Sequence, residues 1–168
     1  MRMEQIVRIQ AGRGSYMPVL MKVMSITTGP VYEIGCGYVS TPYLHWSCFD
    51  KKRPLVSYEN DPAWHEFTDR YSCDYHKVLK ISDWGLADVS GICSVALVDH
   101  SPDVRRKEEI KRLTHAEYVV VHDTENRVAR KYNFEEIFGL FRYRYKYRSA
   151  MPHTTVFSNY HDLSRFTV

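Results

Sequence analysis

The segment Val31–Gly37 constrains the fold of this chain more than any other stretch. It reads VYEIGCG, an apolar run with an acid two residues before a Gly-x-Gly turn. Glycine is needed where a strand turns sharply into a helix and where the backbone must come close to a ligand. The helix that follows such a turn offers unpaired N–H groups to a polar ligand. The segment therefore predicts a strand, a tight loop and a helix around a ligand site.

The composition is that of an ordinary soluble domain. The chain has 168 residues, enough for one domain with a buried core, and a net charge of +3, which is too small to predict nucleic-acid binding. No apolar run approaches the roughly 20 residues that cross a bilayer, and residues 1–14 lack the apolar segment of a secretory signal. The cysteines form no C-x-x-C pair, so we expect free, mostly buried thiols in a cytoplasmic protein; they are Cys36, Cys48, Cys73 and Cys93.

Apolar runs alternate with helical stretches through most of the chain. The expected strands are Val31–Ile34, Pro54–Tyr58, Val78–Ile81, Cys93–Val98 and Glu117–Val121. The expected helices between them are Thr41–Phe49, Pro62–Tyr71 and Pro102–Thr114. Three junctions pair an N-cap side chain with proline at the first helical position, namely Thr41-Pro42, Asp61-Pro62 and Ser101-Pro102. Repeated joints of this kind predict βα units and a parallel sheet.

The last third of the chain has a different pattern. A helix over about Asn126–Phe138 precedes two further strands, Phe141–Arg148 and Thr154–Tyr160, whose short connection requires antiparallel pairing. We therefore expect an α/β fold, a Rossmann-like, doubly wound and mostly parallel seven-stranded sheet with a C-terminal antiparallel hairpin. The single domain 1–168 would comprise a helical segment (1–30, with a helix at about 15–26), the βα units (31–125), and the helix and hairpin (126–168).

Each of the five parallel strands ends in an acid. Ligands of open parallel sheets bind outside the carboxyl ends of the strands, so these residues are site candidates. Carboxylates also cap helices, so one acid alone would indicate little, but five at one edge indicate a binding site. They are Glu33 with Gly35 and Gly37, then Glu59, Asp83, Asp99 with His100, and Asp123 with His122.

Two kinds of site fit this arrangement, one for a dinucleotide and one for a nucleoside cofactor. Glu59 lies 22 residues past Gly37, close to the spacing at which an acid reaches a ribose. A nicotinamide site would need a third glycine, and Ser40 stands at that position. An acid before the first glycine is also foreign to the nicotinamide fingerprint, so nicotinamide binding is the minority interpretation.

The pattern resembles the class I S-adenosylmethionine-dependent methyltransferases over about residues 27–160. VYEIGCG matches that family's E/D-x-G-x-G loop, with Val39 in place of a third glycine, and SYEN at 57–60 resembles the strand whose acid binds both ribose hydroxyls. Asp83, with Trp84 beside it, falls where the family contacts adenine, and the terminal hairpin matches the family fold. The resemblance thus implies a cofactor site made of Glu33, Gly35, Cys36, Gly37, Glu59, Asp83 and Trp84.

Within that class, residues 98–100 and 121–124 most resemble the metal-dependent catechol-type O-methyltransferases. The resemblance implies that Asp99 and Asp123 ligate Mg²⁺ or another divalent cation and that the enzyme methylates oxygen of a small molecule. Thr124 replaces that family's asparagine ligand, and Pro102 stands where its catalytic lysine falls. Asp99 or His100 is then the candidate base at the acceptor. The [D/N]-P-P-[Y/F] signature of amino-group methyltransferases and the Pro-Cys nucleophile of cytosine-C5 enzymes are absent.

The segment 141–148 alternates aromatic residues with cations. One interpretation is a strip that binds phosphate or nucleic acid, with tyrosines as stacking platforms. The favoured interpretation is an edge strand whose cations oppose edge pairing while its tyrosines pack on the sheet. Two alternatives to the small-molecule enzyme therefore stay open, an RNA-associated methyltransferase and a nucleoside-binding module without turnover. A homo-oligomer, in which a partner subunit completes the acceptor site, also stays open.

Overall fold

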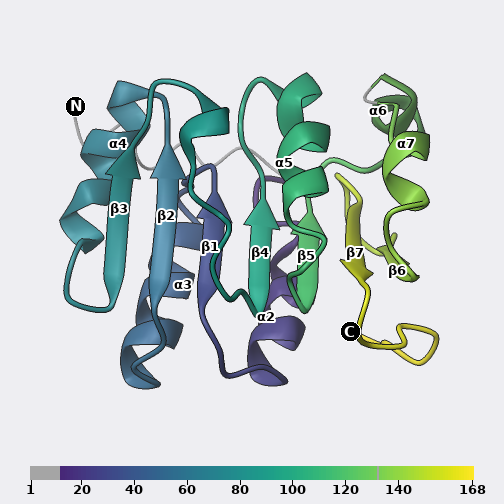
Figure 1. The fold of residues 1–168 in the computed structure, drawn as a ribbon, viewed down its shortest axis with the longest axis horizontal. Helices are drawn as coiled ribbons and strands as arrows, with labels where there is room; N and C mark the ends of the chain where they lie inside the picture. The colour runs from purple at the N-terminus through teal and green to yellow at the C-terminus, as the bar shows by residue number, and fades with distance from the viewer. Residues whose placement is uncertain (1–11, 132) are drawn as a thin grey trace.

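The chain folds around a seven-stranded sheet (Figure 1), and the computed structural model describes residues 12–131 and 133–168. The strand order is β3-β2-β1-β4-β5-β7-β6. Strands β1 to β5 are parallel, and β7 is antiparallel to both β5 and β6. The bounds are β1 Val31–Ile34, β2 Leu55–Glu59, β3 His76–Lys80, β4 Val95–Val98, β5 Tyr118–Val121, β6 Tyr143–Tyr147 and β7 Thr154–Ser158. The predicted Rossmann-like fold with its C-terminal hairpin is confirmed.

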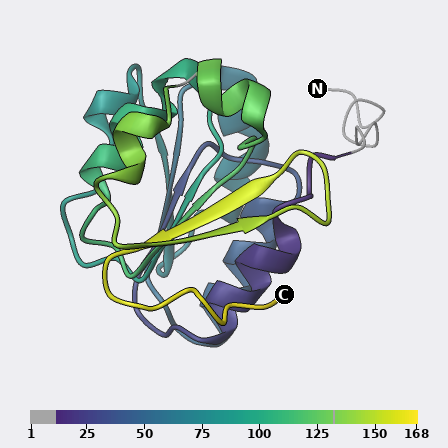
Figure 2. The same cartoon turned by 90° about the vertical axis from the view of Figure 1, so that its right-hand side faces the viewer.

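Helices cover both faces of the sheet, which is visible edge-on in Figure 2. Apolar side chains of α2 and α3 pack on one face, and those of α5 and α7 pack on the other. The helices are α2 Met17–Ser25, α3 Ser40–Asp50, α4 Pro62–Thr68, α5 Arg106–Arg112, α6 Asn126–Lys131 and α7 Glu135–Phe138. Residues 1–11 of the predicted helical segment lie outside the described residues. Among the helices described, none has the length and apolarity to span a membrane.

The central strands have the buried character expected of a covered parallel sheet. Every residue of β1, β4 and β5 is buried, because both faces of these strands lie under helices. All four cysteines are free thiols, and three of them are buried while Cys73 is half-buried. Burial raises the pKa of the Cys48 thiol to about 11 and that of Cys93 to about 12, so both stay protonated.

Only one of the three predicted proline junctions is a conventional N-cap. Asp61 caps α4 and accepts hydrogen bonds from the N–H groups of Ala63 (2.8 Å) and Trp64 (3.1 Å). Thr41 lies inside α3, because its hydroxyl donates to the buried Glu33 carboxylate instead. The Ser101–Pro102 bond is cis, and the α-helix begins four residues after Pro102, at Arg106. The prediction was therefore wrong at Thr41 and Ser101.

The position of strand β6 explains the alternation of aromatic residues and cations in residues 141–148. It is an edge strand, and its tyrosines 143, 145 and 147 pack on the cluster that contains α2 and α3. The Tyr145 ring, for example, lies 5.0 Å from the ring of Phe166. Since these rings are packed, they are not free platforms for stacking bases. The cations of the strand point to the opposite face, where α6 and α7 lie.

Candidate functional site

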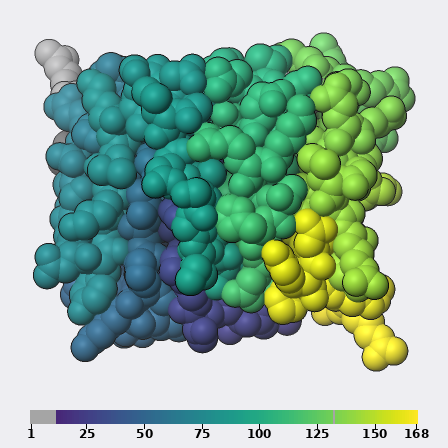
Figure 3. Space-filling model, viewed as in Figure 1, coloured from purple at the N-terminus to yellow at the C-terminus, as the bar shows by residue number. Residues whose placement is uncertain are grey.

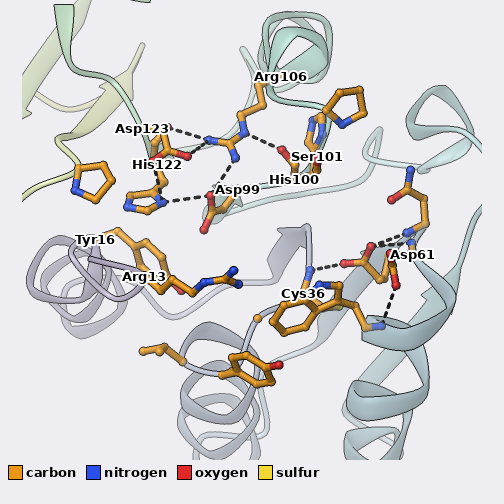
Figure 4. Close-up of a pocket in the computed structure, with 18 of the residues that line it drawn as sticks. Arg13, Tyr16, Cys36, Asp61, Asp99, His100, Ser101, Arg106, His122 and Asp123 are labelled. Carbon is orange, nitrogen blue, oxygen red and sulfur yellow. Dashed lines mark hydrogen bonds and ion pairs between the residues drawn. The ribbon is translucent and has the colours of Figure 1, made fainter. Parts of the chain in front are cut away.

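A cavity of about 850 Å³ opens at the carboxyl ends of β1, β2, β4 and β5 (Figure 4). Its size is that of a small-molecule site. Most of the acids predicted at this edge of the sheet are found in its wall. The residues that line it include Arg13, Tyr16, Cys36, Gly37, Tyr38, Glu59, Asn60, Asp61, Trp64, Asp99, His100, Ser101, Pro102, Arg106, His122 and Asp123.

The glycine loop lies directly against the end of β4. Gly35 has a φ of +97°, and a Cβ there would lie 2.6 Å from the Cα of His100 and 2.7 Å from the carbonyl oxygen of Asp99. Both the backbone conformation and the contact exclude any larger residue. Gly35 thus brings the loop close to the end of β4, and Cys36 and Gly37 line the cavity.

Glu59 lies at the end of β2 and is almost fully buried. Its Oε1 accepts hydrogen bonds from the N–H groups of Asn60 and Asp61, both at 2.8 Å, and its Oε2 accepts one from Cys36 at 2.9 Å. Burial raises the pKa of this carboxyl although the three N–H groups oppose the shift. A carboxylate offers about four acceptor positions, so one position on Oε2 remains for a ligand hydroxyl. The predicted contact with both ribose hydroxyls would require one of these bonds to be released.

Glu33 does not line the cavity. Its carboxylate is completely buried and accepts hydrogen bonds from Thr41 Oγ1 (2.9 Å) and Ser57 Oγ (2.6 Å). Thr41 Oγ1 in turn accepts the N–H of Gly37. Burial raises the pKa of Glu33 to about 7, while hydrogen bonds from neighbouring hydroxyls limit the shift. Glu33 therefore positions the glycine loop through Thr41 rather than contacting a ligand in the cavity.

The prediction that Asp83 and Trp84 contact the ligand does not fit their positions. Asp83 is exposed, lies outside the cavity, accepts a hydrogen bond from Gly85 N and forms an ion pair with Arg105. Trp84 is buried behind the cavity wall, where its Nε1–H donates to the carbonyl of Ser101 at 2.9 Å. Its ring stacks on His100 with centroids 4.3 Å apart. The pair caps and anchors a short turn.

Arg106 joins the ends of β4 and β5. Its guanidinium lies 3.0 Å from Asp99 Oδ1 and 2.8 Å from Asp123 Oδ2, and the side chain is only 6% exposed (Figure 4). It also donates to the carbonyl oxygens of His100 and His122. The two acids do face each other as predicted. This arginine bridges them and offsets one of their two negative charges, and the sequence alone did not identify it.

His122 supplies a second positive charge beside the two acids. Its Nδ1 lies 3.1 Å from Asp99 Oδ1, and its Nε2 lies 2.8 Å from Ser15 Oγ. Since Ser15 donates its own proton to the carbonyl of Pro152, it can only accept from His122. Both ring nitrogens therefore carry protons. Burial lowers the pKa of His122, but the hydrogen bond and charge of Asp99 outweigh it and raise the pKa above its ordinary value.

These contacts do not favour a divalent cation. Ligand atoms of Asp99, His122 and Asp123 lie within 4.8 Å of one another, a spacing that a metal could use. However, the histidine must be neutral to bind a metal, and here Nδ1 and Nε2 both donate. Arg106 and His122 already supply positive charge to both carboxylates at the position where a cation would act. The donor set thus fits an arginine-bridged acid pair rather than the predicted Mg²⁺ site.

His100 is held away from general-base chemistry. Its Nε2 lies 3.0 Å from Glu109 Oε2, and both side chains are buried. Burial lowers the pKa of His100, against the opposing effect of Glu109. Its Nδ1 is buried and has no hydrogen-bond partner within residues 12–131 and 133–168. Asp99 differs, because Oδ1 holds two donors while Oδ2 has no hydrogen-bond partner among the described residues. Asp99 is therefore the better candidate of the two for contact with an acceptor.

The charge on His122 should make stability depend on pH. Because folding raises the pKa of His122, its contribution is fully present below the ordinary value of about 6.5 and is lost as the pH rises through the folded-state pKa. We expect the difference in unfolding free energy between wild type and His122→Gln to shrink as the pH rises above about 6.5. Urea denaturation of both proteins checks this. A difference that is constant or grows with pH contradicts the assignment.

The comparisons with known proteins identify the fold and not the family. No protein-family model and no curated protein matches the sequence. Among solved structures, the N-terminal domain of human METTL16 in complex with SAH matches with a TM-score of 0.64 and 11% identity, covering 92% of this chain and 74% of that one. SAH-bound methyltransferase PaMTH1 of Podospora anserina matches with 0.63 and 14%, covering 89% and 78%. A Pyrococcus furiosus methyltransferase matches with 0.59 and 14%, covering 89% and 86%.

Proposed function

We propose that this chain is an S-adenosylmethionine-dependent methyltransferase that methylates a hydroxyl group. The observation that carries the proposal is the free acceptor position on Glu59 Oε2, in the wall of a cavity of about 850 Å³ and beside the glycine loop. The solved structures that share the fold include methyltransferases with bound SAH. Their identities of 11% and 14% support the fold only, so the activity rests on the residues of this site.

The cavity wall fits the parts of this cofactor. Glu59 would accept a hydrogen bond from a ribose hydroxyl. The glycine loop would let the backbone come close to the ligand. Tyr38 and Trp64, whose rings lie 4.3 Å apart in the wall, offer an apolar surface to a flat base. When bound, S-adenosylmethionine supplies an activated methyl group.

Asp99 is the residue that we assign to the methyl acceptor. Arg106 and His122 fix its Oδ1, so Oδ2 is held toward the cavity in one orientation. An acceptor hydroxyl can donate its hydrogen bond to Oδ2, which orients the oxygen and offers a site for its proton. Arg106 and His122 act as positioning residues, because they hold Asp99 and need not touch the acceptor.

Calorimetric titration with S-adenosylhomocysteine tests the proposed cofactor. We expect saturable binding with one ligand per chain, and no heat of binding from NADH at the same concentrations. Binding of NADH instead, or the absence of binding by either compound, overturns the proposal. Binding without methyl transfer to any offered hydroxyl would favour the alternative of a nucleoside-binding module without turnover.

A further inference from the structure

A second cavity, of about 560 Å³, lies between the α6–α7 region and the β6–β7 hairpin. Figure 3 shows this last third of the chain as the yellow-green and yellow surface at the right-hand edge of the molecule. The cavity does not share lining residues with the first one. Its wall consists of Thr124, Asn126, Ala129, Arg130, Asn133, Phe134, Glu135, Phe138, Arg144, Lys146, Arg148, Thr155 and Phe157.

The wall of this cavity is strongly basic. Four cations line it, Arg130, Arg144, Lys146 and Arg148, against one carboxylate, Glu135. In the part of the chain that the structure describes, none of the four forms an ion pair. Lys146 donates to the amide oxygen of Asn126, and Arg144 lies over the Phe138 ring. Positive charge is thus collected in a concave surface without a matching negative charge.

Lys146 shows the effect of that imbalance. Burial lowers the pKa of its ammonium group, and the positive charges of Arg148 and Arg144 lower it further against the opposing charge of Glu125. An edge strand that only opposed pairing would direct its cations into open water. Here three cations lie side by side along one wall of a cavity that Arg130 of α6 also lines, and an anion there would relieve their repulsion.

The cations form a row rather than a single nest. Arg144, Lys146 and Arg148 alternate along the chain, so neighbouring members are about 6.6 Å apart along the strand. A chain of phosphodiesters presents negative charges in a row of its own, so it matches the pattern.

The row leads to the proposed acceptor site. Strand β6 runs in the same direction as β5, since β7 is antiparallel to both, and so the Arg148 end of the row lies at the edge that carries Asp99 and Asp123. Asp123 lines the first cavity and the next residue, Thr124, lines the second. A ligand that follows the row therefore arrives beside the first cavity.

We propose that this basic cavity binds the phosphate backbone of single-stranded nucleic acid. A cavity of about 560 Å³ has room for a few backbone groups of one strand. That such a strand delivers the methyl acceptor rests on the proposed function, and it favours a nucleic-acid acceptor over the small molecule that the sequence predicted.

The test measures anisotropy of a labelled oligouridylate of about 12 nucleotides on the full chain, over a salt range of about 50 to 200 mM. The variant Arg144→Gln, Lys146→Gln, Arg148→Gln should bind at least tenfold more weakly. Its slope of log K against log salt should be shallower by about 2, since three phosphate contacts are lost. The control Lys51→Gln, Lys77→Gln, Lys80→Gln removes the same charge from exposed positions away from the cavity and should bind within twofold of wild type.

Several results overturn the proposal. They are no binding of the probe by wild type, an equal loss of affinity in both triple variants, and equally tight binding of a labelled oligoglutamate of the same length. Titration with S-adenosylhomocysteine distinguishes failure of this proposal from failure of the proposed function. The triple variant of the basic cavity should bind that compound as tightly as wild type does. If wild type binds the oligonucleotide but not the compound, only the proposed methyltransferase function is refuted.

Discussion

Arg106→Ala should lower the free energy of unfolding by about 3 kcal/mol, because it leaves Asp99 and Asp123 close together without their shared counter-charge. The two carbonyl oxygens of His100 and His122 would lose a donor as well. Arg106→Lys should recover only part of the loss, since an ammonium group cannot reproduce the planar fork that contacts both acids.

Urea denaturation measures this loss as a fall in the midpoint with an unchanged m-value. Arg70→Ala is the matched control. That arginine is exposed and its guanidinium lies 5.1 Å from the Phe67 ring, so its loss should cost about 1 kcal/mol or less. Equal effects of the two substitutions would show that the acids do not depend on Arg106, and a divalent cation would again be the better explanation of their pairing.

Glu59→Ala should weaken S-adenosylhomocysteine binding by roughly 10- to 150-fold, the effect of losing a hydrogen bond to a buried charged group. Glu59→Gln should lose less, because its amide oxygen can still accept the N–H groups of Asn60 and Asp61. The substituted amide would place a second donor against Cys36 N–H, and so affinity should still fall below that of wild type.

Calorimetry measures the affinities, and thermal unfolding of the same samples shows whether the variants are folded. Glu66→Ala removes the same charge from an exposed position on α4 and should leave the affinity unchanged. A folded Glu59→Ala protein with wild-type affinity would remove the ribose contact and with it the main support for the proposed cofactor.

The sheet could be predicted from the sequence because its central strands are apolar in both alternating positions. A run such as residues 95–98, with sequence VALV, has no polar face to expose, and so it must lie inside a covered sheet. The same logic placed Glu59, Asp99 and Asp123 at one edge, since parallel strands end together. The starts of helices were harder to predict from the sequence. The hydroxyl of Thr41 could cap a helix or bind Glu33, and only the folded structure brings the buried Glu33 carboxylate next to it.

The residues that the sequence did not reveal act through contacts between distant segments. Arg106 sits inside a predicted helix and has the same local signal as its neighbours Arg105 and Lys107. Its role depends on the position of two strand ends. Two acids that face each other require a positively charged partner. That requirement was the one sequence-based indication that a basic residue lies beside Asp99 and Asp123. The positions of Asp83 and Trp84 likewise depend on contacts with distant segments, since Asp83 pairs with Arg105 and Trp84 donates to the carbonyl of Ser101.

The strand order also determines at which point of synthesis the sheet can be completed. β1 is an interior strand, with Val31 paired to Leu55 on one side and to Val95 on the other. During synthesis the second side must wait for the chain to reach β4, and an open strand edge is prone to aggregation in that interval. Glu59 is synthesised before β4 pairs with the open side of β1, and Asp99 is synthesised directly after β4. Occupancy of the cavity by a ligand therefore reports that both halves of the sheet have joined.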